Sequence, residues 1–321
     1  MQEIQITEQE AGQRLDKLLA KYLNLAPKSF FYKMLRKKNI TLNGKKAAGN
    51  EKLAKGDCVK LFLSDETIQK FSEVFSEYTE EELDILYEDP DVILINKPVG
   101  MLSQKASSAD QSLVEHLISY LVRSGALCEE DLKTFRPSIC NRLDRNTSGI
   151  VAAGKTMAGL QALNQLFHDR SIGKYYLCLV KGEIKESSRI EGWLKKDTQT
   201  NKVEITAQEM PDSVWIATEY RPVKSNHDVT LLEVHLITGK THQIRAHLAS
   251  LGHPLIGDPK YGDARLNQEY RKRYQVRSQL LHAASLKFPV CEGALKEVSR
   301  KEFQAPLPEP FLRIVKEQGV Q

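Results

Sequence analysis

The chain has 321 residues, of which 46 are Lys or Arg and 42 are Asp or Glu. This length is enough for two domains, or for one large domain with an appendage. No apolar run approaches the roughly 20 residues of a membrane span, and the polar, acidic start MQEIQITEQE is unlike a secretory signal. The five cysteines are scattered without a C-x-x-C pair, which favours free thiols over disulfides or a zinc site. We therefore expect a cytoplasmic protein.

Charge is distributed unevenly along the chain. Residues 1–64 contain 13 Lys and Arg against 6 Asp and Glu, whereas residues 65–84 contain one Lys against eight acids. The remaining residues are nearly balanced, with 32 basic and 28 acidic side chains. This pattern is typical of a polyanion-binding module joined to a second domain. We predict a basic head (residues 1–64), an acidic linker without periodicity (65–84) and a body (85–321).

The head has the pattern of two helices followed by short strands. Leu15, Leu18, Leu19 and Tyr22 recur at helical spacing and predict the first helix. A second helix is expected from Ser29, as its cap, to Lys38. Strands are expected over 40–42 and 58–63, next to glycine-containing turns. The second helix interleaves aromatic side chains with the cations Lys33, Arg36, Lys37 and Lys38. Such a charge run is often only a solvated helix face, which is the alternative interpretation.

The order of these head elements resembles the small alpha-L RNA-binding module, which a small-subunit ribosomal protein shares with tyrosyl-tRNA synthetases. The matching motifs are R-L-D-K at 14–17, I-T-L-N-G at 40–44 and G-D-C-V-K-L at 56–61. The resemblance covers roughly fifty residues and rests on several short motifs. It implies a small α/β RNA-binding domain in which Lys33, Arg36, Lys37 and Lys38 bind RNA.

The body combines helical and strand-like periodicities. Helices are predicted over 112–123 and 157–168, and a buried strand over 92–95. From residue 174 onward short strand-like segments dominate, at 174–181, 189–194, 201–206, 213–223 and 227–237. Several of them alternate apolar and polar residues, as antiparallel strands with one buried face do. The predicted fold class is α+β, with a mixed, mostly antiparallel sheet.

One stretch of the body carries a candidate catalytic acid. The segment R-L-D-R-N-T-S-G at 142–149 places Asp144 between Arg142 and Arg145, before a polar turn and an apolar strand. A carboxylate there would lie at the mouth of a sheet, and nearby guanidinium groups would keep it ionised. Taken alone, such a turn is more often a surface ion pair with no chemical role.

Further motifs accompany this stretch. They are N-K-P-V-G at 96–100, K-Y-Y-L-C-L-V at 174–180, G-K-T-H-Q-I-R-A-H at 239–247, H-P-L-I-G-D-P-K-Y-G at 253–262 and L-H-A at 281–283. In this order, over about residues 84–310, they resemble the RluA-type family of RNA pseudouridine synthases. Members of that family often carry an alpha-L module at the N-terminus, which matches the head. The resemblance implies a pseudouridine synthase fold and an isomerase that needs no cofactor.

The resemblance also implies roles for single residues. Asp144 corresponds to the family's catalytic aspartate, an oxygen nucleophile that holds sugar or base covalently while the other turns. Arg245 would pair with Asp144 and keep it anionic. Tyr176 would stack on the uracil or act as a base, and Arg142 and Arg145 would hold the RNA backbone. The sequence leaves open whether Asp144 attacks the sugar or the base.

One departure from the family pattern concerns the residue before R-L-D, which is commonly His and here is Asn141. An amide can form hydrogen bonds but carries no charge, so we expect Asn141 to affect loop positioning rather than activity. It also favours the rival hypothesis of a non-catalytic RNA-binding protein. The preferred substrate is large-subunit ribosomal RNA or a pre-ribosomal particle, because the alpha-L module commonly accompanies it in this family. Transfer RNA is the alternative, and a monomer without a membrane partner is expected.

Two other patterns are weighed against this interpretation. The segment G-I-V-A-A-G-K-T at 149–156 satisfies the phosphate-loop motif, but its apolar, partly β-branched interior predicts a strand. His242 and His247 are five residues apart, a spacing that does not put both rings on one helix face as metal-binding motifs require. We therefore expect neither nucleotide hydrolysis nor a metal site.

Overall fold

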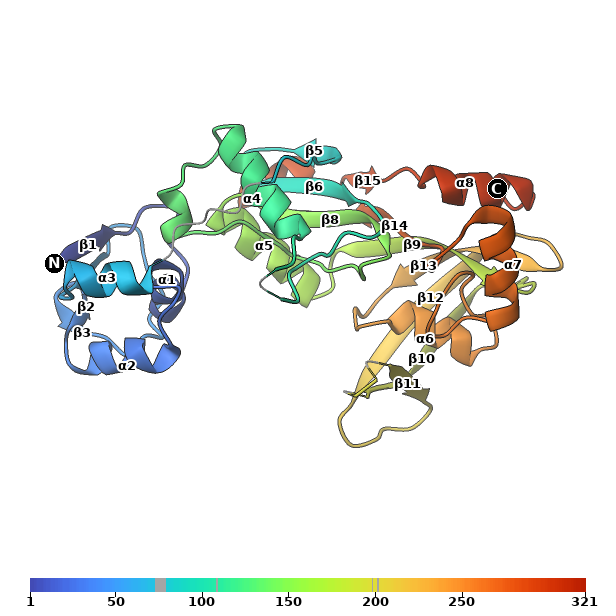
Figure 1. Ribbon diagram of the computed structural model, residues 1–321, viewed down its shortest axis with the longest axis horizontal. Helices are drawn as coiled ribbons and strands as arrows, with labels where there is room; N and C mark the ends of the chain where they lie inside the picture. Colours follow the sequence, from blue (N-terminus) through green and yellow to red (C-terminus); the bar gives the residue numbers. More distant parts are fainter. Residues whose placement is uncertain (73–78, 108, 198, 201) are drawn as a thin grey trace.

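The computed structural model describes residues 1–72, 79–107, 109–197, 199–200 and 202–321. Figure 1 shows the head at one end of an elongated molecule and the body extending away from it. The N-terminus lies in the head and the C-terminus at the opposite end of the body. None of the helices in the described part of the chain is long and apolar enough to cross a lipid bilayer.

The head contains a four-stranded sheet with strand order β1-β4-β2-β3, packed against helices. Its core is formed by the apolar positions that the sequence spaced at helical intervals, among them Leu15, Leu18, Phe31 and Leu35. The second helix begins at Lys28 with Pro27 at its cap position, so Ser29 does not cap it as predicted. The elements are β1 (Gln2–Gln5), α1 (Leu15–Tyr22), α2 (Lys28–Arg36), β2 (Ile40–Leu42), β3 (Lys45–Lys46) and β4 (Cys58–Leu61).

Part of the predicted linker is a helix, α3 (Asp65–Phe71), which the sequence analysis missed. Ser64 caps it, because its hydroxyl accepts a hydrogen bond from the Thr67 amide. Ile68 is buried in the head core, and the Phe71 ring lies 4.7 Å from that of Phe30. The acids of its first turn favour the positive end of the helix dipole, so a composition rich in acid does not prevent a helix here.

The rest of the predicted linker approaches the body. Thr79 is buried, and its hydroxyl forms a hydrogen bond of 2.7 Å with His116 of helix α4 (Leu113–Arg123). Residues 73–78, which belong to the same predicted linker, lie outside the described residues.

The head also contacts the body directly. Gln13 donates a hydrogen bond to the carbonyl oxygen of Thr134 at 3.3 Å, and the Thr134 hydroxyl donates to the buried Glu10 at 2.7 Å. The Lys21 ammonium lies 5.8 Å from the centre of the buried Phe135 ring. The head is therefore packed against the loop that follows the 3-10 helix η1 (Asp131–Lys133) as well as being joined covalently.

The described part of the body is organised around an eleven-stranded sheet, with order β11-β10-β12-β13-β9-β14-β8-β6-β5; β7 pairs with β8 and β15 with β14, off this path. Among the described residues, all strand pairs are antiparallel except β14 with β8, which confirms the predicted mixed, mostly antiparallel sheet. Its strands are β5 (Ile85–Glu88), β6 (Val92–Lys97), β7 (Ser138–Ile139), β8 (Ser148–Gly154), β9 (Gly173–Lys181), β10 (Ser188–Lys196), β11 (Val203–Thr206), β12 (Ser213–Ser225), β13 (Val229–Leu236), β14 (Leu281–Lys287) and β15 (Glu302–Gln304).

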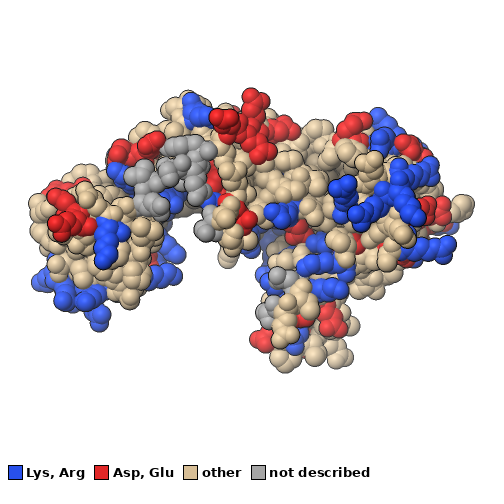
Figure 2. All heavy atoms as spheres, viewed as in Figure 1, with Lys and Arg blue, Asp and Glu red and all other residues tan. Residues whose placement is uncertain are grey.

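Helices cover both faces of this sheet. Helix α4 and α6 (Gln243–Ser250) pack with Tyr176 and Val234 on one face. Helix α5 (Met157–His168) packs on the opposite face, where α7 (Ala264–Tyr274) and α8 (Glu309–Glu317) cover Leu179 and Leu231. Strands β10, β11 and β12 extend from the body as an arm, and Figure 2 shows a deep notch between this arm and the head.

Candidate active site

The catalytic candidate Asp144 lies in a turn between β7 and β8 that is fixed from several sides. The Thr147 amide donates to the Asp144 carbonyl oxygen at 3.0 Å, which closes the turn. On one flank the Leu143 amide donates to the Ser103 hydroxyl at 3.0 Å. On the other flank Ser148 shares a hydrogen bond of 2.9 Å with the buried His282. We call residues 143–148 the catalytic turn.

Gly149 is required where the catalytic turn enters β8. Its φ is +109°, and a Cβ there would come within 2.2 Å of the carbonyl oxygen of Ala283. Strand β14 runs beside β8 at this position, pairing Ala283 with Gly149 in parallel register. Any side chain would force the two strands apart and displace the catalytic turn.

Lys97 at the end of β6 is hydrogen-bonded to the backbone of the catalytic turn. Its side chain is fully buried, and its ammonium group donates to the carbonyl oxygens of Pro98, Met101 and Arg145 at 2.9, 2.9 and 3.1 Å. The Arg145 carbonyl oxygen also accepts from the Gly100 amide at 2.9 Å. Burial lowers the pKa of Lys97 to about 8, although the negative charge of Asp144 opposes this change.

Arg245 joins two carboxylates. Its Nη1 donates to Asp144 Oδ2 at 2.7 Å, while Nε and Nη2 donate to the two oxygens of Asp258 at 2.7 and 2.9 Å. The side chains of Arg245 and Asp258 are 5% and 0% exposed, whereas that of Asp144 is 28% exposed. Asp258 therefore holds the guanidinium in one orientation, and Asp144 is the member of the triad that substrate can reach.

Electrostatics keep Arg245 and Asp258 ionised. Burial alone would lower the pKa of Arg245, but the hydrogen bonds and charges of Asp258 and Asp144 raise it above its ordinary value. Burial would likewise raise the pKa of Asp258, yet Arg245 and the backbone amides of Lys260 and Tyr261 lower it. One guanidinium thus pairs with two carboxylates, the buried Asp258 and the more exposed Asp144.

Arg245 is placed by the start of α6. Gln243 is buried, and its amide donates to the Ala217 carbonyl oxygen and the Thr218 hydroxyl of β12, both at 3.0 Å. These bonds fix the first turn of the helix against the sheet. Arg245, two residues later, then faces the catalytic turn.

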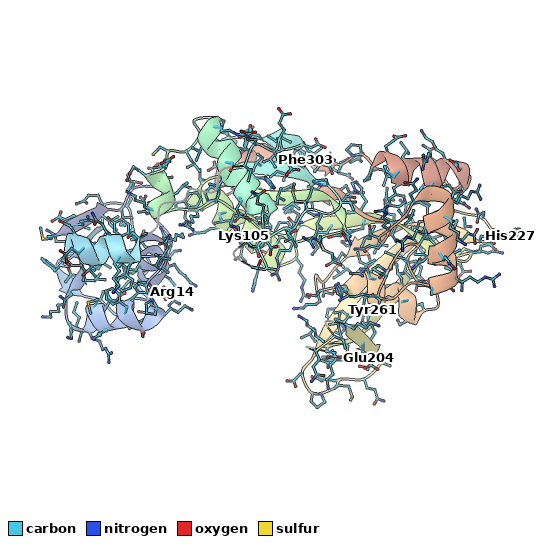
Figure 3. The ribbon with its side chains drawn as sticks, viewed as in Figure 1. Arg14, Lys105, Glu204, His227, Tyr261 and Phe303 are labelled. Carbon is cyan, nitrogen blue, oxygen red and sulfur yellow. The ribbon has the colours of Figure 1, made fainter. Side chains whose placement is uncertain are left out.

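His242 and Tyr261 complete the surroundings of Asp144. His242 Nε2 lies 3.9 Å from Asp144 Oδ2, and its Nδ1 forms a hydrogen bond of 3.0 Å with the Tyr261 hydroxyl. Burial lowers the pKa of His242, and the attraction of Asp144 does not reverse the shift, so the imidazole is neutral at neutral pH. Figure 3 places Tyr261 where the arm leaves the body, and its hydroxyl accepts from the Val203 amide of β11 at 2.8 Å.

Tyr176 lies on β9, on the sheet face that α6 covers. Burial raises the pKa of its phenol, and the charge of Asp144 raises it further. The phenol is therefore neutral at physiological pH, which argues against its acting as a base and leaves the stacking role. No hydrogen bond from the Tyr176 hydroxyl to another described residue is present.

The other predicted site residues fall into two places. Arg142 and Arg145 are exposed on either side of Asp144. Asn141 binds the backbone of β8, because its amide donates to the Ile150 carbonyl oxygen at 3.1 Å and accepts from the Ala152 amide at 2.8 Å. The predicted head cations are exposed on α2 and just after it, away from the catalytic turn: Lys33, Arg36, Lys37 and Lys38.

The phosphate-loop match at 149–156 is a strand, as predicted. Its residues through Gly154 form the fully buried β8. The Lys155 ammonium pairs with Glu88 at 2.6 Å, and the Thr156 hydroxyl accepts from the Gly159 amide as the cap of α5. Over the described residues, no group of three or more His, Cys, Asp or Glu is arranged to hold a metal ion.

Three residues of the site had no assigned role in the sequence analysis: Lys97, Asp258 and Tyr261. Each stands inside a motif that was assigned to the site, N-K-P-V-G or G-D-P-K-Y-G. For Asp258, the available signal was a charged residue enclosed by Gly257 and Pro259. The sequence could not show that Asp258 pairs with Arg245, because that contact requires the loop to fold back onto α6.

Comparisons with known proteins agree with this geometry. A family model described as RNA pseudouridylate synthase matches residues 91–250. The chain is 30% identical to ribosomal large subunit pseudouridine synthase C of Vibrio vulnificus, covering 98% of this chain and 96% of that protein. It is 31% identical to the RNA pseudouridine synthase YlyB of Bacillus subtilis, covering 98% of each. The structure of human RNA pseudouridylate synthase domain containing 4 has the same fold, with a TM-score of 0.59 and 20% identity over 73% of this chain and 92% of that one.

The fold and the catalytic turn define an RNA-modifying isomerase. The chain belongs to the RluA-type family of RNA pseudouridine synthases, as the sequence motifs predicted.

Proposed function

We propose that this enzyme isomerises uridine in large-subunit ribosomal RNA, in the cytoplasm, with Asp144 as its nucleophile. The observation that carries the catalytic assignment is the Asp144–Arg245–Asp258 triad. It presents one accessible carboxylate, at 28% exposure, whose charge is balanced by a guanidinium that is itself locked by a buried acid. A nucleophile must be reachable, and a cation beside it favours its anionic form; Asp144 is partly exposed and contacts Arg245 at 2.7 Å.

The reaction exchanges one bond to the ribose for another. The bond between ribose C1′ and uracil N1 breaks while the Asp144 carboxylate holds sugar or base. The base turns, C1′ bonds to C5, the proton of C5 leaves to water and N1 gains a proton. Tyr176 stacks on the turning ring, and Arg142 and Arg145 hold the flanking phosphates. The target base must first leave its helix stack, which costs a few kcal/mol.

The ribosomal substrate is supported by the relatives. The Vibrio vulnificus protein is named for the large ribosomal subunit and matches nearly the whole chain, head included. The exposed cations of α2 suit a folded RNA gripped by its phosphates. Transfer RNA and a protein that binds RNA without turnover are the competing outcomes of the experiment below.

Substitution Asp144→Asn tests the proposal. Unmodified transcripts of large-subunit ribosomal RNA and of transfer RNA, tritiated at uracil C5, are incubated with each protein. We expect tritium release from the ribosomal transcript with wild type and none with the variant, while RNA affinity stays nearly unchanged. Asp131→Asn, an exchange at the first residue of the 3-10 helix η1 and outside the triad, serves as the matched control and should release tritium normally. Release by Asp144→Asn, or release from transfer RNA alone, would contradict the proposal.

A further inference from the structure

Helix α7 and the turn after it carry a second concentration of positive charge, far along the chain from the head. Only Glu269 opposes it between residues 264 and 277. Figure 2 shows Lys and Arg atoms gathered where Figure 1 places α7. Among the described residues, none of these cations has an ion-pair partner. The exposed cations of this α7 patch are Arg265, Arg271, Lys272, Arg273 and Arg277.

Helix α7 is held by apolar anchors and a cap, and Arg273 of the patch lies over a ring of the helix, 4.9 Å from the centre of Tyr274. Tyr270 and Tyr274 are each 4% exposed and anchor the helix in the core shared with α8. The Asp263 side chain caps its start by accepting from the Leu266 amide at 3.0 Å. Cations in the last turn favour the helix dipole, but Arg265 lies in the first turn, where the dipole opposes it. Unpaired like charges within a Debye length of about 8 Å repel one another, so the patch lowers stability unless an anion binds it.

The helix is also connected to the catalytic triad. Asn267 of α7 accepts a hydrogen bond from the Gly257 amide at 2.7 Å and donates to the Asp258 carbonyl oxygen at 2.8 Å. Asp258 in turn orients Arg245. The α7 patch is thus held in a fixed position relative to Asp144, although α7 packs on the sheet face opposite Tyr176.

We infer that the α7 patch binds the phosphate backbone of the RNA substrate at a site remote from the target uridine, independently of the head. This rests on the proposed function, because it takes RNA to be the polyanion. A folded RNA that enters the catalytic site can continue around the end of the sheet and place phosphates along α7. Guanidinium groups are well suited to such contacts because they donate to two phosphate oxygens at once. The patch contributes affinity and leaves the chemical step unchanged.

The experiment measures RNA affinity against salt in the full-length Asp144→Asn protein, which binds without turnover. The probe is an unmodified transcript of large-subunit ribosomal RNA. The test variant adds Arg271→Gln and Lys272→Gln, two exposed cations outside the core. The matched control adds Lys296→Gln and Arg300→Gln, which remove two positive charges from exposed positions in and just after the 3-10 helix η2 (Gly293–Val298). Glutamine keeps the helix propensity of the positions it replaces.

We expect the test variant to reduce the slope of log affinity against log salt by about 2, since each phosphate contact contributes about 1. The control should leave the slope unchanged. Equal slopes for the two variants would overturn the inference, including the case in which the patch binds an acidic protein. In the active background, the test variant should raise the apparent Michaelis constant on the long transcript and leave the saturating single-turnover rate intact.

The outcomes also separate this inference from the proposed function. If wild type releases no tritium from ribosomal RNA, the proposed substrate is wrong, while the binding slopes still decide the role of the patch on this probe. If wild type releases tritium and the two slopes agree, only the α7 inference fails.

Discussion

The catalytic turn and the basic helices use charge in opposite ways. Around the turn, Lys97, Arg245 and Asp258 are buried, and each is bonded to backbone carbonyls or to an opposite charge. On α2 and α7 the cations are exposed, and none has an ion-pair partner among the described residues. Buried, satisfied charges fix geometry, whereas exposed, unsatisfied ones remain available to a partner. In the proposed function, the groups that position Asp144 are therefore separate from the groups that hold the RNA.

The largest difference between the two kinds of charge should appear when an arginine is removed. Arg245→Ala leaves Asp258 buried without its partner, which costs about 3–5 kcal/mol of stability for a buried ion pair. It should also abolish tritium release, because Asp144 loses its counter-ion. Urea unfolding and tritium release measure the two effects. If Arg245→Ala proved as stable as wild type, the buried ion pair of Arg245 and Asp258 would not contribute to the free energy of unfolding.

A control variant and a milder variant test whether the effect comes from the buried position and the geometry of Arg245. Arg221 is 61% exposed and pairs with Glu233 at 2.8 Å on the sheet, so Arg221→Ala should change stability and activity little. Arg245→Lys retains the charge but loses the fork that binds both carboxylates. It should fold, retain only a small part of the activity and bind RNA as well as wild type.

Lys97 predicts a pH effect of intermediate size. Its pKa is lowered to about 8, so above that pH the neutral amine has two N–H groups for three carbonyl oxygens. The catalytic turn should loosen, and the single-turnover rate should fall several-fold between about pH 7.5 and 9. In Lys97→Met the rate should be low throughout and lack this step. A wild-type profile identical in shape to that of the variant would exclude Lys97 as the cause.

The free energy of unfolding should increase over the pH range in which the single-turnover rate falls. The unfolded chain keeps the pKa of Lys97 near 10.5, so between about pH 8 and 10.5 the unfolded state binds more protons than the folded one. The contribution of Lys97 to the free energy of unfolding therefore rises with pH there, and its cost is fully present below pH 8. Urea midpoints of wild type relative to Lys97→Met should increase from pH 8 to 9.5 while activity falls.

Sequence predicted the regular elements better than their long-range contacts. The helix over 157–168 was predicted with its observed bounds, because its apolar positions repeat at helical spacing. Helix α3 was missed, because its apolar residues are only Ile68 and Phe71 and it opens the segment 65–84, which holds eight acids. Local pattern could not show that Asp144 and Arg245 meet, since they are separated by 101 positions. The order of motifs supplied that pair, and only the folded loop revealed Asp258.

The contact between head and body changes how the head can be tested. Deleting residues 1–64 would remove the core against which Ile68 of α3 packs. It would also remove the contacts that the head makes with Phe135 and Thr134 of the body. A loss of activity after such a deletion would not distinguish RNA binding from damage to the body. Charge substitutions at Lys33 on α2 and at Lys37 just after it avoid this ambiguity, because both side chains are exposed.

Charge substitutions in the head should have the smallest effect, confined to the binding of long RNA. Lys33→Gln with Lys37→Gln removes two unpaired cations, whereas the matched pair Lys55→Gln with Lys60→Gln removes two that pair with Glu8 and Glu3. On long ribosomal RNA the first pair should flatten the salt slope by about 2, and the second should flatten it less, because paired lysines release fewer phosphate counterions. On an RNA too short to span from the catalytic turn to the head, both pairs should match wild type in affinity and rate. If the first pair slowed the short RNA as well, α2 would act on the catalytic site itself rather than on distant phosphates.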